Sequence, residues 1–230
     1  MNFYKGIQDG VPIGIGYFAV SFSFGIAGSG TLSWALLTLV SMLNLTSAGQ
    51  FAGLQIIEAA GTFFEMAIAT FFINLRYSLM AISLSQKVDS SFGTFKRMLL
   101  STGITDEIYA VAMAQKGRIP ASYFLGLTVL PYVGWSLGTF VGAFSGNILP
   151  QVLTNAFGVA LYGMFVAIVV PKMKQHRATF WAVGVAIGFS LAFRYLPLLS
   201  GVSVGFSIIL SAIGASLVAA LLFPIEEVDS

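Results

Sequence analysis

Six stretches of about 20 mainly apolar residues recur along the chain, and this repetition constrains the fold more than any other feature. A helix needs about 20 such residues to cross the hydrocarbon core of a bilayer. The composition agrees, because 9% of the residues are charged, compared with about 25% in soluble domains. The sequence therefore predicts an all-α polytopic membrane protein with full transmembrane helices at 11–29, 62–86, 121–145, 153–171, 178–195 and 203–223.

Two further segments, 33–57 and 98–115, are less uniform. The first starts apolar and becomes small and polar in "TSAGQ", and the second carries Asp106 and Glu107 at its centre. Either both segments span the membrane, which gives eight helices, or both are short or re-enter the membrane as bent or half-helical segments. Backbone that bends at membrane depth is tolerated where it is buried in protein or lines a cavity. Such a pair of segments indicates a transport site.

The charges of the loop 87–97 favour re-entry. This loop contains Lys87, Lys96 and Arg97, which the positive-inside rule places in the cytoplasm. Eight full spans would put the loop outside, whereas six spans with two re-entrant segments put it inside. Both arrangements place the N- and C-termini in the cytoplasm. We expect residues 1–230 to form a single integral membrane transport domain.

The stretch "FFINLRYSLM" places Asn74 and Arg76 deep in an apolar segment. A charge at the centre of a bilayer costs about 3 kcal/mol or more, so Arg76 must face protein or water and needs an acidic partner. Asp106 and Glu107 reach the same depth whether their segment spans or re-enters. Because residues 74 and 76 are about 200° apart on a regular helix, a site that uses both side chains requires local unwinding.

The two polar segments also carry signals for breaks and helix starts. In "TSAGQF", Ser47 and Gln50 bring hydrogen-bonding groups into apolar surroundings, and Gly49 permits a break. In "TGITDE", Thr105 is expected to cap a helix whose first turn contains both acids. The bare N–H groups at the start of such half-helices favour a carboxylate.

Several kinds of function have no supporting motif in the sequence. The chain has no cysteine and one histidine, His176, which lies in a basic loop. It contains neither a G-x-x-x-x-G-K-[ST] phosphate-binding loop nor an H-E-x-x-H zinc motif. We therefore expect no enzyme activity, no cofactor, no metal site and no nucleic-acid partner.

Five stretches together resemble the AzlC family of branched-chain amino acid exporters, which are bacterial inner-membrane proteins. They are "GIQDGVPIGIGYFAVSFSFG" at 6–25, "SAGQFAGLQII" at 47–57, "FFINLRYSLMAISL" at 71–84, "TDEIYAVA" at 105–112 and "GMFVAIVVPKMK" at 163–174. The resemblance covers essentially the whole chain. It implies export of branched-chain amino acids or analogues across the bacterial cytoplasmic membrane, together with a small AzlD-type membrane partner.

The chain departs from the family pattern at Tyr77, where the family typically has histidine. A histidine titrates near neutral pH and a tyrosine does not. Proton coupling through position 77 is therefore not expected in this chain, and identity of substrate choice does not follow from the resemblance.

These observations predict a secondary transporter for a small zwitterion with an apolar side chain. Arg76 would bind the carboxylate, and Asp106 or Glu107 would take the ammonium group or a coupling proton. The predicted substrate-binding residues are Arg76, Asn74, Gln50, Ser47, Asp106 and Glu107. The alternative is a structural or channel-like membrane subunit whose buried charges hold an assembly together.

Overall fold

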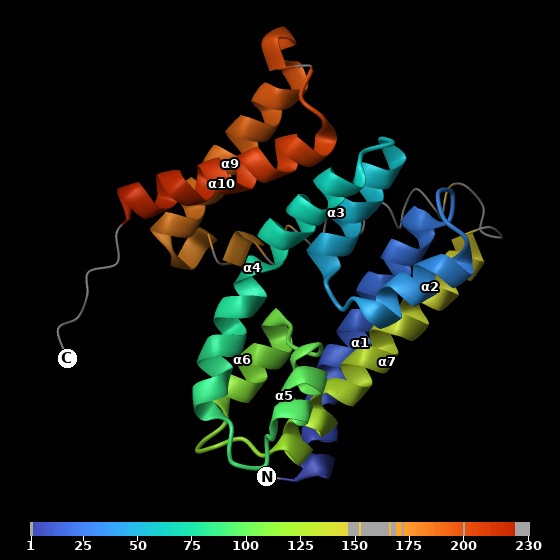
Figure 1. Cartoon of the computed structure of the whole chain (residues 1–230), viewed down its shortest axis with the longest axis vertical. Coiled ribbons are helices and arrows are strands. Elements are labelled where there is room, and N and C mark those ends of the chain that lie inside the picture. The colour runs from blue at the N-terminus through green and yellow to red at the C-terminus, as the bar shows by residue number, and fades with distance from the viewer. Residues whose placement is uncertain are drawn as a thin grey trace. The chain divides into compact units, whose positions relative to one another are not determined.

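The computed structural model describes residues 2–146, 173–199 and 201–223, together with Val152, Val166 and 169–171. In this part of the chain every regular element is a helix, and the strand-like pairing is one isolated parallel bridge between Val88 and Ile119. Five described helices are long and apolar enough to cross a membrane (Figure 1): α1 (Phe3–Gly28), α4 (Phe63–Lys87), α7 (Ala121–Gly146), α9 (Arg177–Tyr195) and α10 (Val204–Leu222).

These five helices coincide with five of the six predicted spans, and the sixth, at 153–171, lies mostly outside the described residues. Helix α1 begins well before the predicted residue 11, because Asn2 accepts a hydrogen bond from the backbone N–H of Lys5 and caps the helix. Lys5 also forms an ion pair with Asp9 one turn later, 2.6 Å apart.

The chain forms two compact units. Unit 1 comprises Met1–Phe51 and Asn74–Leu161, and unit 2 comprises Ala52–Ile73 and Tyr162–Ser230. Helices α3 (Ser47–Glu58) and α4 therefore contribute residues to both units.

Glycines hold the long helices α1 and α7 of unit 1 side by side and parallel (Figure 1). A Cβ atom added to Gly6 would lie 2.1 Å from the carbonyl oxygen of Tyr123, and one added to Gly25 would lie 2.3 Å from that of Thr139. The same holds in the other direction, since a Cβ at Gly142 would lie 2.1 Å from a carbonyl of α1. Such backbone contact requires small residues and makes this pair the frame of unit 1.

The segment 33–57 is broken into α2 (Trp34–Leu43) and α3, separated by residues 44–46. Trp34 packs on Phe140 near the end of α7, and the carbonyl of Met42 accepts a hydrogen bond from Tyr132 in the middle of α7. Phe51 then packs on Phe24, near the end of α1. Within unit 1, α2 and α3 therefore form a helical hairpin. It enters from the end of the unit where α7 ends, turns near the middle of α7 and returns toward the same end.

The segment 98–115 is also broken, into α5 (Thr94–Ser101) and α6 (Asp106–Ala114). The end of α6 and the residues after it contact the end of α4, because the ammonium of Lys87 donates to the carbonyl of Met113 and Val88 pairs with Ile119. This hairpin therefore leaves and returns at the end of unit 1 where α7 starts, opposite to the end from which α2 enters.

In unit 2, α9, the short 3-10 helix Pro197–Leu199 and α10 follow one another, and α9 packs against α10. Glu65 is buried there. Its carboxylate accepts hydrogen bonds from Thr62 at the start of α4 and from Ser203 at the start of α10. Thr62 in turn accepts from the backbone N–H of Glu65, which forms a capping box. Glu65 therefore stabilises two helix starts.

Candidate functional site

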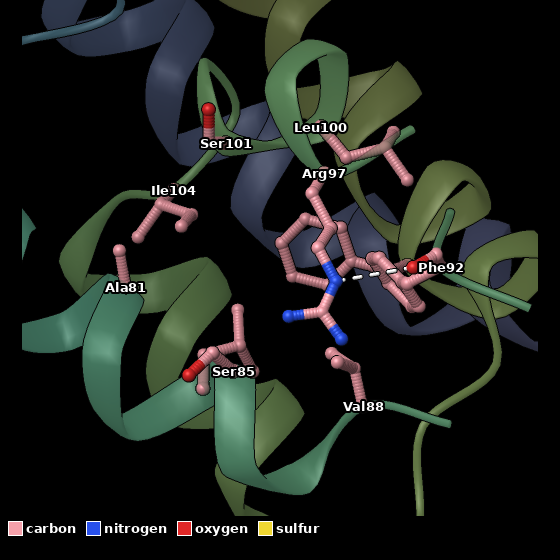
Figure 2. Close-up of a pocket in the computed structure, with 10 residues that line it drawn as sticks. Ala81, Ser85, Val88, Phe92, Arg97, Leu100, Ser101 and Ile104 are labelled. Carbon is pink, nitrogen blue, oxygen red and sulfur yellow. Dashed lines mark hydrogen bonds between the residues drawn. The ribbon is translucent and has the colours of Figure 1, made fainter. Parts of the chain in front are cut away.

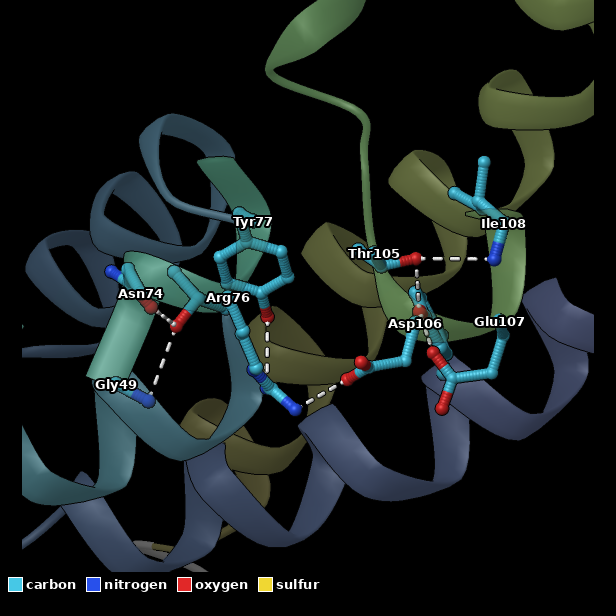
Figure 3. A network of polar contacts seen from close by, with 10 residues as sticks. Gly49, Asn74, Arg76, Tyr77, Thr105, Asp106, Glu107 and Ile108 are labelled. Carbon is cyan, nitrogen blue, oxygen red and sulfur yellow. Dashed lines mark hydrogen bonds and ion pairs between the residues drawn. The ribbon is translucent and has the colours of Figure 1, made fainter. Parts of the chain in front are cut away.

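Two half-helices of unit 1 begin at the middle of the long helices, with their N-terminal ends in one polar network (Figure 3). Thr46 caps α3, because its Oγ1 accepts a hydrogen bond from the backbone N–H of Gly49 at 3.1 Å. Thr105 caps α6 and accepts from the backbone N–H of Ile108 at 3.4 Å. The predicted cap at Thr105 is therefore confirmed. Each cap leaves earlier N–H groups of its helix without an intrahelical partner.

Arg76 of α4 forms an ion pair with Asp106, the first residue of α6 (Figure 3). Its Nη1 lies 2.6 Å from Oδ2 of Asp106, and its Nη2 donates to the hydroxyl of Tyr77 at 3.1 Å. The side chain of Arg76 is 44% exposed and that of Asp106 is 38% exposed. Both side chains of the pair are therefore partly exposed on this chain.

Glu107, the next residue, has a different partner. Tyr17 of α1 donates its hydroxyl proton to Oε2 of Glu107 at 2.5 Å and shares a second hydrogen bond with Thr105 at 2.6 Å. Tyr17 is buried, whereas Glu107 is exposed. The two adjacent acids are thus divided between an arginine and a tyrosine.

Asn74 connects α4 to the start of α3, since its Oδ1 accepts a hydrogen bond from Thr46 at 3.0 Å. Helix α4 is continuous through this region, so the local unwinding that a single site lined by both Asn74 and Arg76 would require is not seen. Asn74 and Arg76 reach different partners on different sides of a regular helix. Gly49 does not form the break either, because α3 includes it. A Cβ there would lie 2.4 Å from Oγ1 of Thr46, so glycine permits the close approach at the cap.

Gln50 is buried, and both polar atoms of its side chain form a hydrogen bond. Its amide donates to Ser41 of α2 at 2.9 Å, and its carbonyl oxygen accepts from the indole of Trp135 at 2.8 Å. Ser41 shares a further hydrogen bond with Thr139 of α7 at 2.7 Å. Trp135 also packs edge-on against Tyr17, with ring centroids 5.4 Å apart. Gln50 therefore fixes α3 against the frame and does not project into open space.

Ser47 is the first residue of α3 and is half-buried. Among the residues that the structure describes, its hydroxyl forms no hydrogen bond. The structure thus brings Arg76, Asp106 and Glu107 together in one region, places Asn74 beside the start of α3, and leaves Ser47 with an unused hydroxyl at that start.

Sequence reasoning missed Tyr17 and Trp135. Both lie in long apolar helices, where an aromatic residue is ordinary. Their partners, Glu107 and Gln50, are 90 and 85 positions away. No local pattern signals such contacts.

The two half-helix starts differ in charge. The first turn of α3 contains no acid, whereas the first turn of α6 contains Asp106 and Glu107. A helix start without acids keeps its partial positive charge and favours an anion, and the two carboxylates favour a cation. No group of three or more potential metal ligands occurs among the described residues. The arrangement therefore suits a small molecule that carries both charges.

A comparison with known protein families finds a match over the region that contains this network. Residues 12–149 match the family model described as AzlC protein, and they include both hairpins and every residue named above in the network. The chain belongs to the AzlC family. The resemblance inferred from the five sequence stretches is thereby confirmed.

Two relatives of this AzlC family member extend the similarity along the chain. The inner membrane protein YgaZ of Escherichia coli (strain K12) is 26% identical over 216 residues, which cover 89% of this chain and 88% of YgaZ. An uncharacterized membrane protein of Archaeoglobus fulgidus is 28% identical over 204 residues, 86% of this chain and 87% of that protein. No solved structure matches the chain. The chain is thus a membrane protein of the AzlC family.

Proposed function

We propose that this AzlC family protein is a secondary transporter that exports branched-chain amino acids or close analogues. The observation that carries the proposal is the half-exposed Arg76–Asp106 pair at the start of a half-helix. A charged pair at membrane depth is costly unless it faces water or a ligand. An exposed ion pair contributes about 0–1 kcal/mol to stability, so a structural role alone accounts poorly for placing it there.

In the proposed mechanism the zwitterion inserts between Arg76 and Asp106. The substrate carboxylate replaces Asp106 on the guanidinium, which binds carboxylates bidentately. The substrate ammonium group binds to the carboxylate of Asp106 or Glu107. The net charge of the site is unchanged by this exchange, so no uncompensated charge is left at depth. The free N–H groups at the start of α3, with Ser47 and Asn74 beside them, supply further polar contacts, and Gln50 acts as a positioning residue.

The proposal includes a topology. The two hairpins enter unit 1 from opposite ends and turn at its middle, which favours two re-entrant segments over two further spans. With six membrane-crossing helices, the proposed orientation has the loop 87–97 and both termini in the cytoplasm, which is supported by Lys87, Lys96 and Arg97 in that loop. Discontinuous helices that meet at the midplane occur in secondary transporters, where they form the substrate site.

The proposal also assigns the chain to the bacterial inner membrane, with a small AzlD-type membrane protein as its partner. The location is supported by the relative YgaZ, which is an inner membrane protein. The partner follows from the family resemblance and is tested by comparing efflux with and without coexpression of such a protein.

The test is efflux of leucine, isoleucine and valine from preloaded cells that express the chain with its partner. Arg76→Gln and Asp106→Asn should each reduce efflux to the background of cells that lack the protein. Lys116→Gln, which removes an exposed loop charge, is the matched control and should export normally. Wild-type efflux from both site variants, at normal membrane levels, would rule out the assignment.

A further inference from the structure

A cavity lies in unit 1 between the last turns of α4, helix α5 and the first turn of α7 (Figure 2). Its volume is about 120 Å³. The apolar walls are buried side chains of the core: Leu84, Val88, Phe92, Leu100, Ile104 and Phe124. The apolar part of the lining therefore belongs to the packed core of the unit, whereas the exposed Ser85, Arg97 and Ser101 leave the cavity open on one side.

Arg97 supplies the only charge among the lining residues that the structure describes. Its Nε donates to the carbonyl oxygen of Phe92 at 3.1 Å, which fixes the guanidinium beside the cavity. Figure 2 shows its two terminal nitrogens extending toward Ser85 and Val88. In the described part of the chain these nitrogens form no hydrogen bond or ion pair. The guanidinium of Arg97 is therefore held at the edge of an apolar cavity, with N–H donors that are not used within the described part of the chain.

These features specify the chemistry of a ligand. The planar guanidinium matches a carboxylate, which it can bind with two parallel hydrogen bonds. An apolar cavity of about 150 Å³ holds a molecule the size of benzene, so this one suits a branched aliphatic group of roughly four carbons. No acid lines the cavity in the described residues, so nothing there selects for an ammonium group.

The cavity also lies next to the candidate substrate site. Ile104 forms part of its wall, and the next residue, Thr105, caps α6 and contacts Tyr17. Ser85 at the cavity is nine positions after Arg76 on α4, which corresponds to roughly 13 Å along the helix. The cavity is at the end of unit 1 where Val88 pairs with Ile119, which is the expected cytoplasmic end.

We infer that Arg97 and this cavity form a second binding site, for a small branched aliphatic carboxylate, through which substrate enters from the cytoplasm. The role in entry rests on the proposed export function, whereas the binding chemistry does not. The site should accept 4-methylvalerate as well as leucine, because it recognises the carboxylate and the aliphatic group only. The Arg76–Asp106 site, by contrast, requires the ammonium group.

Protection of a single thiol tests this inference without relying on transport. The chain has no cysteine, and Ser101 is exposed and lines the cavity. The Ser101→Cys protein, reconstituted with its partner in phosphatidylcholine vesicles, is labelled with a maleimide. Leucine or 4-methylvalerate at ten times the dissociation constant should slow labelling about tenfold. Glycine, which has no aliphatic side chain, should not slow it.

Matched variants define the site. Arg97→Gln should abolish protection, whereas Lys96→Gln, which removes the neighbouring charge outside the cavity, should keep it. Ala81→Leu, which fills the cavity from its rim, should also abolish protection and serves if Arg97→Gln does not fold. Protection should persist in an Arg76→Gln background. If the chain proved not to export amino acids, protection of the thiol would be unchanged. A failure of the second binding site can therefore be told apart from a failure of the proposed export function.

Three outcomes would overturn the inference. The first is an absence of protection by any aliphatic carboxylate. The second is protection that survives Arg97→Gln. The third is a thiol that is protected by phosphatidylglycerol in the vesicles and not by the added carboxylates. The cavity would then be a site for an anionic lipid headgroup.

Discussion

The hydroxyl of Tyr17 lies 2.5 Å from a carboxylate oxygen of Glu107 and so joins the long helix α1 to the first turn of the half-helix α6. The same hydroxyl contacts Thr105, the residue that caps α6. One side chain of the rigid α1–α7 frame therefore fixes the start of a half-helix at the candidate site. We expect this contact to be needed for transport even though Tyr17 does not touch the ion pair.

Tyr17→Phe should reduce efflux roughly 10- to 100-fold, because a hydrogen bond to a charged group contributes about 1.5–3 kcal/mol. The protein should still reach the membrane, since the aromatic ring and its packing on Trp135 are kept. Tyr132→Phe is the control, as its hydroxyl donates to a backbone carbonyl outside the network. Equal efflux from the two variants would contradict a positioning role for Tyr17.

The ion pair between Arg76 and Asp106 gives a prediction that separates binding from structure. The double variant Arg76→Asp with Asp106→Arg restores opposite charges across the contact. If the pair binds the zwitterion, membrane levels should recover while efflux stays at background, because each charge now faces the wrong end of the substrate. Recovery of both membrane level and efflux would instead favour a structural ion pair.

Packing of α1 on α7 should be intolerant of any side chain at Gly142. A Cβ there would lie 2.1 Å from the carbonyl oxygen of Phe22, and helix backbone cannot yield as a flexible side chain can. We expect Gly142→Ala to cost at least about 1–3 kcal/mol, the usual cost of overpacking, measured as a lower unfolding temperature in detergent. Gly184→Ala in α9 has open space around the new atom and should leave that temperature unchanged or slightly raised.

The sequence was sufficient to predict features that depend on local patterns. Apolar length predicted the long helices, and the order Thr105, Asp106, Glu107 predicted where α6 begins. The pairing of Arg76 with an acid of that segment followed from the cost of an isolated charge at depth. Contacts between distant apolar helices could not be predicted in this way. The role of Tyr17 depends on how α1 packs, and Gly49 looked like a break because a close approach to Thr46 leaves no local signal.

The loop that connects α4 to α5 should respond to pH through Asp89. Its carboxylate accepts hydrogen bonds from the hydroxyl and the backbone N–H of Ser91, and these hold the pKa of Asp89 below its ordinary value of 3.8. A lowered pKa in the folded state means that the contribution to stability is present above the ordinary value. It is lost as the pH falls below that value and through the lowered pKa.

Hydrogen–deuterium exchange measures this effect. The amide protection of Ser91, corrected for intrinsic exchange, should fall as the pH is lowered from about 5 to about 3. Asp89→Asn keeps an acceptor oxygen but does not titrate, so its protection should be lower and independent of pH in that range. The same pH dependence in both proteins would show that another group is responsible.

The two ends of unit 1 can be assigned to the two sides of the membrane with single cysteines. Ser90 lies in the exposed loop after Val88, at the end where α7 starts, and Gly30 follows Ser29, which lies beside Gly146 at the other end. Neither position is crowded, and Ser91 is avoided because its hydroxyl accepts a hydrogen bond from the backbone of Ala121. With re-entrant hairpins, a membrane-impermeant maleimide should label Gly30→Cys in intact cells and Ser90→Cys only after the cells are opened. Labelling of both positions in intact cells would mean that 33–57 and 98–115 span the membrane. The candidate site would then lie among eight full transmembrane helices and not between two re-entrant segments.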